Sequence, residues 1–293
     1  MSKLLDLIGN TPIVELNQLS VNKNVTIYGK LEGTNPGGSV KDRAAYGMIK
    51  GAIERGDITK GIKLIEATSG NTGIALAMIA NLFGIDIELV MPEDATRERV
   101  LTMQAFGAKV ILTPKAQSME GAIDYANEQV QKGGYLMLNQ FANPDNPAMH
   151  YTTTGPEIWR DTQKKVTHFV SSMGTTGTIM GVSKFLKEKN SNIQIVGCQP
   201  TEGSRIPGIR KWQEAYLPKI FDRSRIDRVI DIAEKDARIM AKRLAKEEAV
   251  FSGMSSGGAV HAAIELSKEL TSGVIVCIIC DRGDRYLSSD LFD

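Results

Sequence analysis

Short apolar runs rich in β-branched residues alternate along this chain with segments of helical periodicity, and this alternation limits the folds open to it. Runs such as LIEA and IQIVG lack polar alternation, which is typical of strands covered on both faces. The pattern predicts an α/β architecture with mostly parallel sheets. The stretch 201–225, which holds Pro207 and Pro218, is expected to be a long ordered loop.

The expected strands are residues 63–67, 85–91, 109–113, 135–139, 168–172, 193–199 and 274–280. The expected helices include residues 73–83, 97–106, 119–132, 178–188, 235–248 and 258–270.

Bulk properties limit the function. The chain has 293 residues and a formal net charge of +1, so its charge does not attract nucleic acid or anionic lipid. No apolar run reaches the roughly 18 residues of a membrane span, and the opening stretch MSKLLDLIGNTP has no apolar run long enough for a signal peptide. Cys198, Cys277 and Cys280 make no disulfide framework, which fits a reducing cytosol. The histidines show no metal-ligand spacing, so no metal is expected.

The stretch NPGGSVKDR, residues 35–43, places Lys41 directly after a Pro-Gly-Gly turn. Ser39 and Asp42 match a capping box, which predicts a helix starting at about Val40. The positive end of the helix dipole disfavours the charged form of an amine in the first turn. A neutral amine can condense with a carbonyl group to form an imine. Lys41 is therefore a candidate nucleophile, and the alternative is a solvated lysine whose stem covers the surface.

Two expected strands lead into small, donor-rich loops that open helices. In EATSGNTGIALAMIA, residues 68–72 form such a loop, and because no lysine follows it is not a Walker A loop. A carboxylate suits this loop as a ligand. In SSMGTTGTIMGV, residues 174–178 carry three hydroxyls and no charge, which suits a phosphate dianion. A third glycine-rich turn is expected at residues 252–260, and plain capped turns are the alternative for each loop.

The stretch IICDRGDRYLS runs from an apolar strand directly into a charged turn. Cys280 is small and neutral, and lies where an edge strand would touch a ligand ring. The alternative is a buried structural cysteine. In open α/β sheets the ligand lies where strand carboxyl ends meet helix N-termini, so these stretches are candidates for ligand contact.

The set NPGGSVKDR, EATSGNTGIALAMIA, GTTGT and SSGG resembles the cysteine synthase family of pyridoxal-phosphate enzymes, which have the tryptophan synthase β-like fold. The resemblance runs essentially end to end, with the motifs in family order. The stretches NQFANPDNPAMHYTTTGPEIW and ICDRGDRYLS are marks of the family's B branch. The resemblance implies two domains, each a mostly parallel twisted sheet flanked by helices. The smaller, mobile domain would be residues 37–146, and the larger would be residues 1–36 plus 147–293.

The resemblance also implies roles for single residues. Lys41 matches the lysine that holds pyridoxal phosphate as a Schiff base and later moves the substrate α-proton. The cofactor phosphate would be held by Gly174, Thr175, Thr176, Gly177 and Thr178. The rest of the cofactor would contact Asn71, Ser255 and Cys280, and either Cys280 or its neighbour Asp281 would face the pyridine nitrogen. The substrate α-carboxylate would be held by Thr68, Ser69, Gly70, Thr72 and Gln140.

The implied reaction is a β-replacement in which O-acetylserine loses acetate and sulfide gives cysteine. The B branch also accepts thiosulfate, which gives S-sulfocysteine. Arg210 and Lys211, in IPGIRKW, are candidates to attract that larger anion, and a solvated surface arginine is the alternative for Arg210. The branch usually has two arginines here, and lysine lacks the planar guanidinium fork, so this departure bears on thiosulfate preference.

Other functions of the same fold are a serine/threonine dehydratase and a cystathionine β-synthase. The chain lacks room for the haem-binding extension or regulatory domain of the latter. A non-catalytic binding protein is the third alternative, and an intact Lys41 with two anion loops argues against it. We expect a cytoplasmic homodimer that acts on small molecules and binds neither nucleic acid nor membrane.

Overall fold

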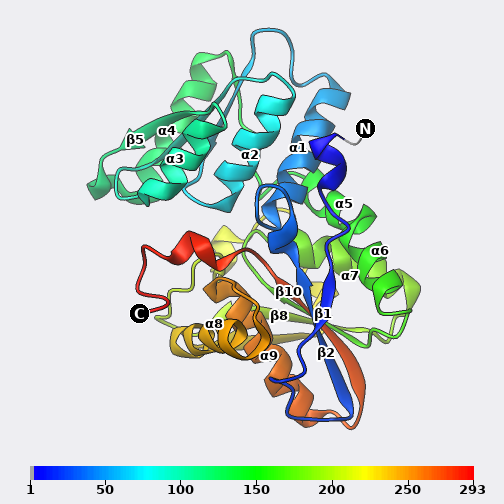
Figure 1. Cartoon of the computed structure of the whole chain (residues 1–293). Helices are drawn as coiled ribbons and strands as arrows, with labels where there is room; N and C mark the ends of the chain where they lie inside the picture. Colours follow the sequence, from blue (N-terminus) through cyan, green and yellow to red (C-terminus); the bar gives the residue numbers. More distant parts are fainter. Residues whose placement is uncertain (1–2) are drawn as a thin grey trace.

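Within residues 3–293, which a computed structural model describes, the chain forms two sheets flanked by helices (Figure 1). The larger sheet has the order β1-β2-β10-β7-β8-β9, and the smaller has the order β5-β4-β3-β6. β1 runs antiparallel to β2, and the other pairs are parallel. The predicted α/β class with two mostly parallel sheets is therefore confirmed.

The strands are β1 (Ile13–Glu15), β2 (Val25–Leu31), β3 (Lys63–Ala67), β4 (Ile87–Pro92), β5 (Lys109–Thr113), β6 (Tyr135–Leu136), β7 (His168–Ser172), β8 (Gln194–Pro200), β9 (Arg228–Ile232) and β10 (Gly273–Ile279). The α-helices are α1 (Lys41–Arg55), α2 (Asn71–Leu82), α3 (Arg97–Ala105), α4 (Ser118–Lys132), α5 (Asp145–Thr152), α6 (Thr154–Asp161), α7 (Gly177–Lys189), α8 (Glu234–Glu248) and α9 (Met254–Glu269). Short 3-10 helices are Leu4–Leu7, Glu32–Thr34, Lys115–Gln117, Glu214–Tyr216, Arg223–Arg225 and Gly283–Tyr286.

Helices cover both faces of each sheet. On the smaller sheet, α4 packs through Ala122 and Ala126 against Ile65, while α1 and α2 cover the face that carries Leu64. In the larger sheet, α8 and α9 share one core with β2 and β10, and α6 and α7 share another with β7. This three-layer packing explains the strands without polar alternation. None of the helices described in residues 3–293 is long and apolar enough to span a membrane.

Most expected elements lie within two residues of their predicted bounds, but three expectations are wrong. β6 ends at Leu136 instead of reaching residue 139. β10 lies between β2 and β7, so Cys280 follows a central strand and not an edge strand. α9 begins at Met254, so most of the stretch 252–260 is helix and not a turn. Its glycines serve close packing instead, since a Cβ on Gly257 would lie 2.2 Å from the carbonyl oxygen of Ala237 on α8.

The helix that carries Lys41 begins within one residue of the predicted position, but the predicted capping box does not form. The carboxylate of Asp42 accepts the N–H of Gly37 instead of that of Ser39. The reason is that the backbone at this turn already has other partners: Ser39 forms an isolated β-bridge with Asp281, and the Val40 N–H donates to the Cys280 carbonyl at 2.8 Å. The turn before Lys41 is thereby joined to the end of β10.

A buried ionic cluster anchors the same helix. Arg43 is fully buried. Its guanidinium donates two hydrogen bonds of 2.7 and 2.8 Å to the Glu32 carboxylate and two of 2.7 Å to the Glu157 carboxylate. Lys30 contacts Glu157 at 2.8 Å. Burial alone would raise the pKa of Glu157, but the bonds and charges of Arg43 and Lys30 lower it to about 2. The cluster ties α1 to β2 and α6, and so holds the start of α1 in place.

Candidate active site

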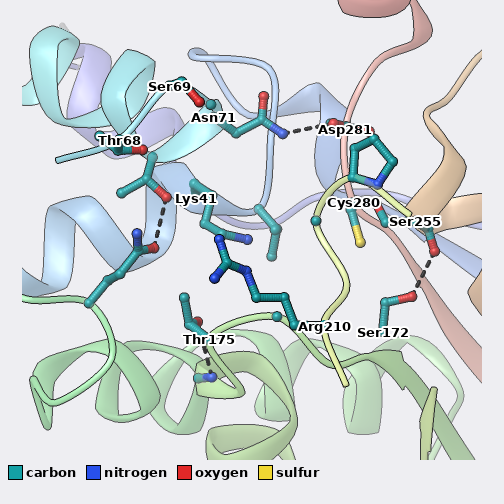
Figure 2. A pocket seen from close by; sticks show the side chains of 18 of the residues that line it. Lys41, Thr68, Ser69, Asn71, Ser172, Thr175, Arg210, Ser255, Cys280 and Asp281 are labelled. Carbon is teal, nitrogen blue, oxygen red and sulfur yellow. Dashed lines mark hydrogen bonds between the residues drawn. The ribbon is translucent and has the colours of Figure 1, made fainter. Parts of the chain in front are cut away.

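The motifs that stood out in the sequence line one cavity of about 410 Å³ (Figure 2). It lies beyond the carboxyl ends of β3, β7 and β10, where parallel sheets place their ligands. Every predicted cofactor and substrate residue contributes to its lining: Lys41, Thr68, Ser69, Gly70, Asn71, Thr72, Gln140, Gly174, Thr175, Thr176, Gly177, Thr178, Arg210, Ser255 and Cys280.

Lys41 extends into the middle of this cavity (Figure 2). Thr68, Ser69 and Asn71 lie on one side of it, and Thr175 lies on the other. The first group comes from the β3–α2 junction and Thr175 from the β7–α7 junction, so the two sheets contribute opposite walls. The amine therefore stands between two donor-rich helix N-termini.

The β7–α7 loop forms a cradle that has room only for a small backbone. A Cβ on Gly174 would lie 2.5 Å from the carbonyl oxygen of Gly208, and one on Gly177 would lie 2.0 Å from the Asn146 side chain. Thr176 caps α7 in the left-handed region with φ 71°. Its hydroxyl is buried and has no hydrogen-bond partner within residues 3–293. A buried unpaired hydroxyl at a helix N-terminus is suited to an anion.

Neutral groups support this cradle from behind. The Nε2 atom of His150 lies 3.2 Å from the Thr178 hydroxyl, and its Nδ1 atom lies 2.8 Å from the Thr154 hydroxyl. Burial, reinforced by the charge of Arg43, lowers the pKa of His150 to about 3. The imidazole is therefore neutral at ordinary pH, and it adds no charge behind the cradle.

The opposite wall carries the loop expected to hold a carboxylate. Gly70 caps α2, which starts at Asn71 and not at residue 73, so Asn71 and Thr72 lie in the first turn of the helix. The Thr72 hydroxyl donates to the Gln140 side-chain oxygen at 2.8 Å. This bond leaves the Gln140 amide N–H₂ available to an anion beside the helix N-terminus.

Cys280 enters the cavity from the end of β10, and its N–H donates to the Ser256 hydroxyl at 2.9 Å. Burial raises the pKa of the Cys280 thiol to about 11, although the charge of Lys41 acts in the opposite direction. The thiol therefore stays protonated at ordinary pH. It presents a neutral group to any ring bound in the cavity.

Comparison with known proteins agrees with this geometry. The family model described as pyridoxal-phosphate dependent enzyme matches residues 4–281. Cysteine synthase B of Pseudomonas aeruginosa is 57% identical over 290 residues, which cover 99% of this chain and 97% of that protein. The chain belongs to the cysteine synthase family of pyridoxal-phosphate-dependent enzymes. Cysteine synthase B of Escherichia coli is 55% identical, with 100% and 96% covered, and the crystal structure of cysteine synthase from Entamoeba histolytica matches with a TM-score of 0.95, 39% identity, and 100% and 90% covered.

The cavity fits the family's cofactor. A phosphate group would satisfy the unpaired Thr176 hydroxyl, and the glycine backbones beside it would leave the space that the group needs. The amine of Lys41 faces the same cavity, where it can bond to the cofactor's carbonyl carbon. The neutral thiol of Cys280 does not enforce protonation of a ring nitrogen.

Sequence reasoning did not place the carboxylate of Asp281 beside Asn71. Asp281, only 2% exposed, accepts from the Asn71 amide at 2.7 Å and from the Tyr286 hydroxyl at 2.6 Å (Figure 2). The Arg285 guanidinium donates to the Asn71 side-chain oxygen. The guanidinium of Arg99 lies 5.7 Å from the Tyr286 ring centre, and both residues line the cavity. The charged turn in ICDRGDRYLS was visible in the sequence, but nothing there indicated that it folds back onto Asn71.

The two candidate cations of the 201–225 loop are separated by the structure. Arg210 lines the cavity, and its guanidinium lies 5.3 Å from the Trp212 ring centre. Lys211 is not among the lining residues. Its Nζ atom lies 3.6 Å from Asp231 and 3.7 Å from Glu202. Lys211 is therefore not a candidate anion contact, because neighbouring residues of an extended loop point in opposite directions and carboxylates hold this one outside.

Proposed function

We propose that this enzyme catalyses a β-replacement in which O-acetyl-L-serine and sulfide give L-cysteine and acetate. One observation carries the proposal: Lys41 stands in one cavity between a cradle suited to phosphate and a loop suited to a carboxylate. The chain's similarity to cysteine synthases over 99–100% of its length supports the same conclusion.

In this proposal each wall has its own task. Pyridoxal phosphate, when bound, supplies an electron sink for the pair left at the substrate α-carbon. Residues 68–72 and Gln140 hold the substrate carboxylate and so orient its α-hydrogen toward Lys41. The Lys41 amine then takes the α-proton as a general base. Acetate leaves from the β-carbon, sulfide forms the new bond to that carbon, and the Lys41 ammonium returns a proton to the α-carbon.

Steady-state kinetics with two sulfur donors test this function. We expect cysteine from O-acetylserine and sulfide, and we also propose S-sulfocysteine from thiosulfate, because Arg210 offers the cavity a cation. Products are identified by chromatography. Formation of pyruvate and ammonia from serine, without sulfide and faster than cysteine formation, would make the enzyme a dehydratase instead.

We further propose that residues 37–146 form a smaller domain that closes over the bound amino acid. Three of its features face the cavity: the 68–72 loop, Gln140, and the α4 residues Met119 and Glu120. Closure excludes water from the reacting carbon. X-ray scattering should show a smaller radius of gyration with O-acetylserine or a slow analogue than without ligand. Identical profiles in both states contradict closure.

We propose that the enzyme is a cytoplasmic homodimer. The free cysteines, two of them buried, fit a reducing compartment. Sedimentation should give a particle with twice the 31.9 kDa mass of the chain. A single-chain mass at micromolar concentration contradicts the dimer.

A further inference from the structure

A buried carboxylate lies beneath the turn that carries Gln140. Glu66 belongs to β3, two residues before the 68–72 loop begins, and is only 5% exposed. Its side chain lies on the same face of the sheet as that of Leu64. The pairing of β6 with β3 ends at Leu64 and Leu136, so Glu66 lies just beyond the last paired residues. The Asn139 N–H donates to the Glu66 Oε2 atom at 3.2 Å. Asn139 has φ 53°, so the chain bends there around the carboxylate.

The same turn is held from its other sides by uncharged groups. The Asn143 amide donates to the Leu138 carbonyl at 2.9 Å, and the Asn146 amide donates to the Gln140 carbonyl at 2.8 Å. These bonds hold the carbonyl oxygens of the turn. On the other side of the turn, the carboxylate of Glu66 accepts the backbone N–H of Asn139 and is the charged group among these contacts. The Gln140 side chain, which bonds Thr72, projects from the backbone that these groups clamp.

Glu66 has no counter-charge of its own. Burial is the largest influence and raises the pKa of Glu66 to about 7, while the N–H groups of Leu138, Asn139 and Gln140 lower it. Within residues 3–293 no charged side chain acts on it. The neighbouring strand has a useful contrast: Glu88 on β4 is 4% exposed, but it contacts Lys109 and the Tyr135 hydroxyl, each at 3.0 Å.

We propose that Glu66 is a positioning residue, whose carboxylate holds the turn 138–140 so that Gln140 presents its amide to the substrate carboxylate. This inference rests on the proposed function of Gln140 in binding the amino acid. It also accounts for the early end of β6, because the backbone N–H groups after Leu136 turn toward Glu66 instead of continuing the ladder.

A dependence on pH follows from this geometry. The ionised carboxylate accepts the N–H groups of the turn, whereas the protonated form brings an O–H donor that faces N–H donors. The N–H groups of the turn lower the pKa of Glu66, so they bond its ionised form in preference to its acid form, while burial sets that pKa at about 7. As pH falls through 7 the acid form replaces the carboxylate, and the turn loses its charged acceptor. The KM for the amino acid should therefore rise below pH 7, and Glu66→Gln should remove this rise.

The test compares Glu66→Gln with Glu88→Gln, a matched buried carboxylate on the next strand whose contacts do not include the turn. We expect Glu66→Gln to raise the KM for O-acetylserine about 3- to 10-fold, the effect of one net hydrogen bond, with the KM for sulfide unchanged. Glu88→Gln should leave both KM values within twofold. An unchanged KM for O-acetylserine in Glu66→Gln, or equal rises in both variants, overturns the inference.

Amide hydrogen exchange of the unmodified enzyme gives a second, activity-independent readout. After correction for intrinsic exchange, residues 138–140 should lose protection between pH 8 and pH 6 relative to the rest of the sheet. Constant protection across this range also overturns the inference, even where Glu66→Gln does not fold. An enzyme that shows this exchange pattern but makes no cysteine refutes the proposed function and leaves the hold of Glu66 on the turn intact.

Discussion

Replacing Lys41 with alanine should reduce cysteine formation by at least about 10³-fold while the chain still folds. The loss is large because, in the function proposed here, one amine is both the covalent anchor of the cofactor and the general base. Folding is preserved because alanine is the best helix former, and the Arg43 cluster that anchors α1 does not involve Lys41. The measurements are kcat with O-acetylserine and sulfide, the thermal unfolding midpoint, and cofactor retained after gel filtration.

Lys50→Ala is the matched control. Lys50 lies on the same helix, its side chain is 53% exposed, and its contact is a 3.6 Å pair with Glu54. We expect its kcat and its cofactor content to equal those of the unmodified enzyme. A Lys41→Ala enzyme that is folded and makes cysteine at the unmodified rate refutes the assignment of Lys41.

The cavity could be predicted from the sequence because its parts are local. Each loop is a run of small donor residues between one strand and one helix, so a single stretch of chain reveals it. The Thr176 hydroxyl and the glycines at 174 and 177 belong to this class. The resemblance to the family added the roles, and parallel pairing of β7 with β10 places the 174–178 loop on the same side of the larger sheet as Cys280.

The strand and helices that sequence reasoning missed depend on contacts between residues far apart in the chain. β2 was missed because Lys30 interrupts its apolar pattern, and only the folded chain shows that this lysine is buried against Glu157. α5 and α6 were missed because Pro147, Gly155 and Pro156 read as breakers. In the structure a Cβ on Gly155 would lie 2.8 Å from the Phe185 Cβ atom, so this glycine allows α6 to approach α7.

The burial and the contacts of Glu66 and Asp281 were missed for a related reason. A carboxylate inside or after an apolar strand reads as an exposed position, since most carboxylates are exposed. Their partners are the Asn139 N–H, 73 residues away, and the Asn71 amide, 210 residues away. Local pattern cannot reveal such pairs. The failed capping box has the same origin, because Asp281 and Cys280 bind the backbone beside Ser39.

The choice of sulfur donor should depend on Arg210. Thiosulfate is a dianion whose distal oxygens need a partner, whereas sulfide is mostly a small monoanion near neutral pH. Arg210 reaches from the loop toward Lys41 and Thr175, and within residues 3–293 no carboxylate pairs with it (Figure 2). Its guanidinium can therefore bond the distal oxygens of a donor bound near Lys41.

Arg210→Ala removes one charge-assisted contact, worth about 1.5–3 kcal/mol. This corresponds to a loss of about 10- to 100-fold in kcat/KM for thiosulfate, with little change for sulfide. Lys211→Ala is the control, because Lys211 is the adjacent cation but pairs with Asp231 and Glu202 outside the cavity. We expect it to alter neither donor.

Trp212 contacts both Arg210 and the loop of the phosphate cradle, so the test must separate loss of an anion contact from damage to that loop. Its indole N–H donates to the Gly174 carbonyl at 2.8 Å, so loss of the stacked guanidinium could shift the phosphate cradle. Such a shift would weaken cofactor binding and lower kcat/KM equally for both donors. The measurement is therefore kcat/KM for each donor at fixed O-acetylserine, together with cofactor content, in both variants. Equal losses in Arg210→Ala would show that Arg210 supports the cradle and does not select the donor, whereas a loss confined to thiosulfate requires a contact that only the larger anion makes.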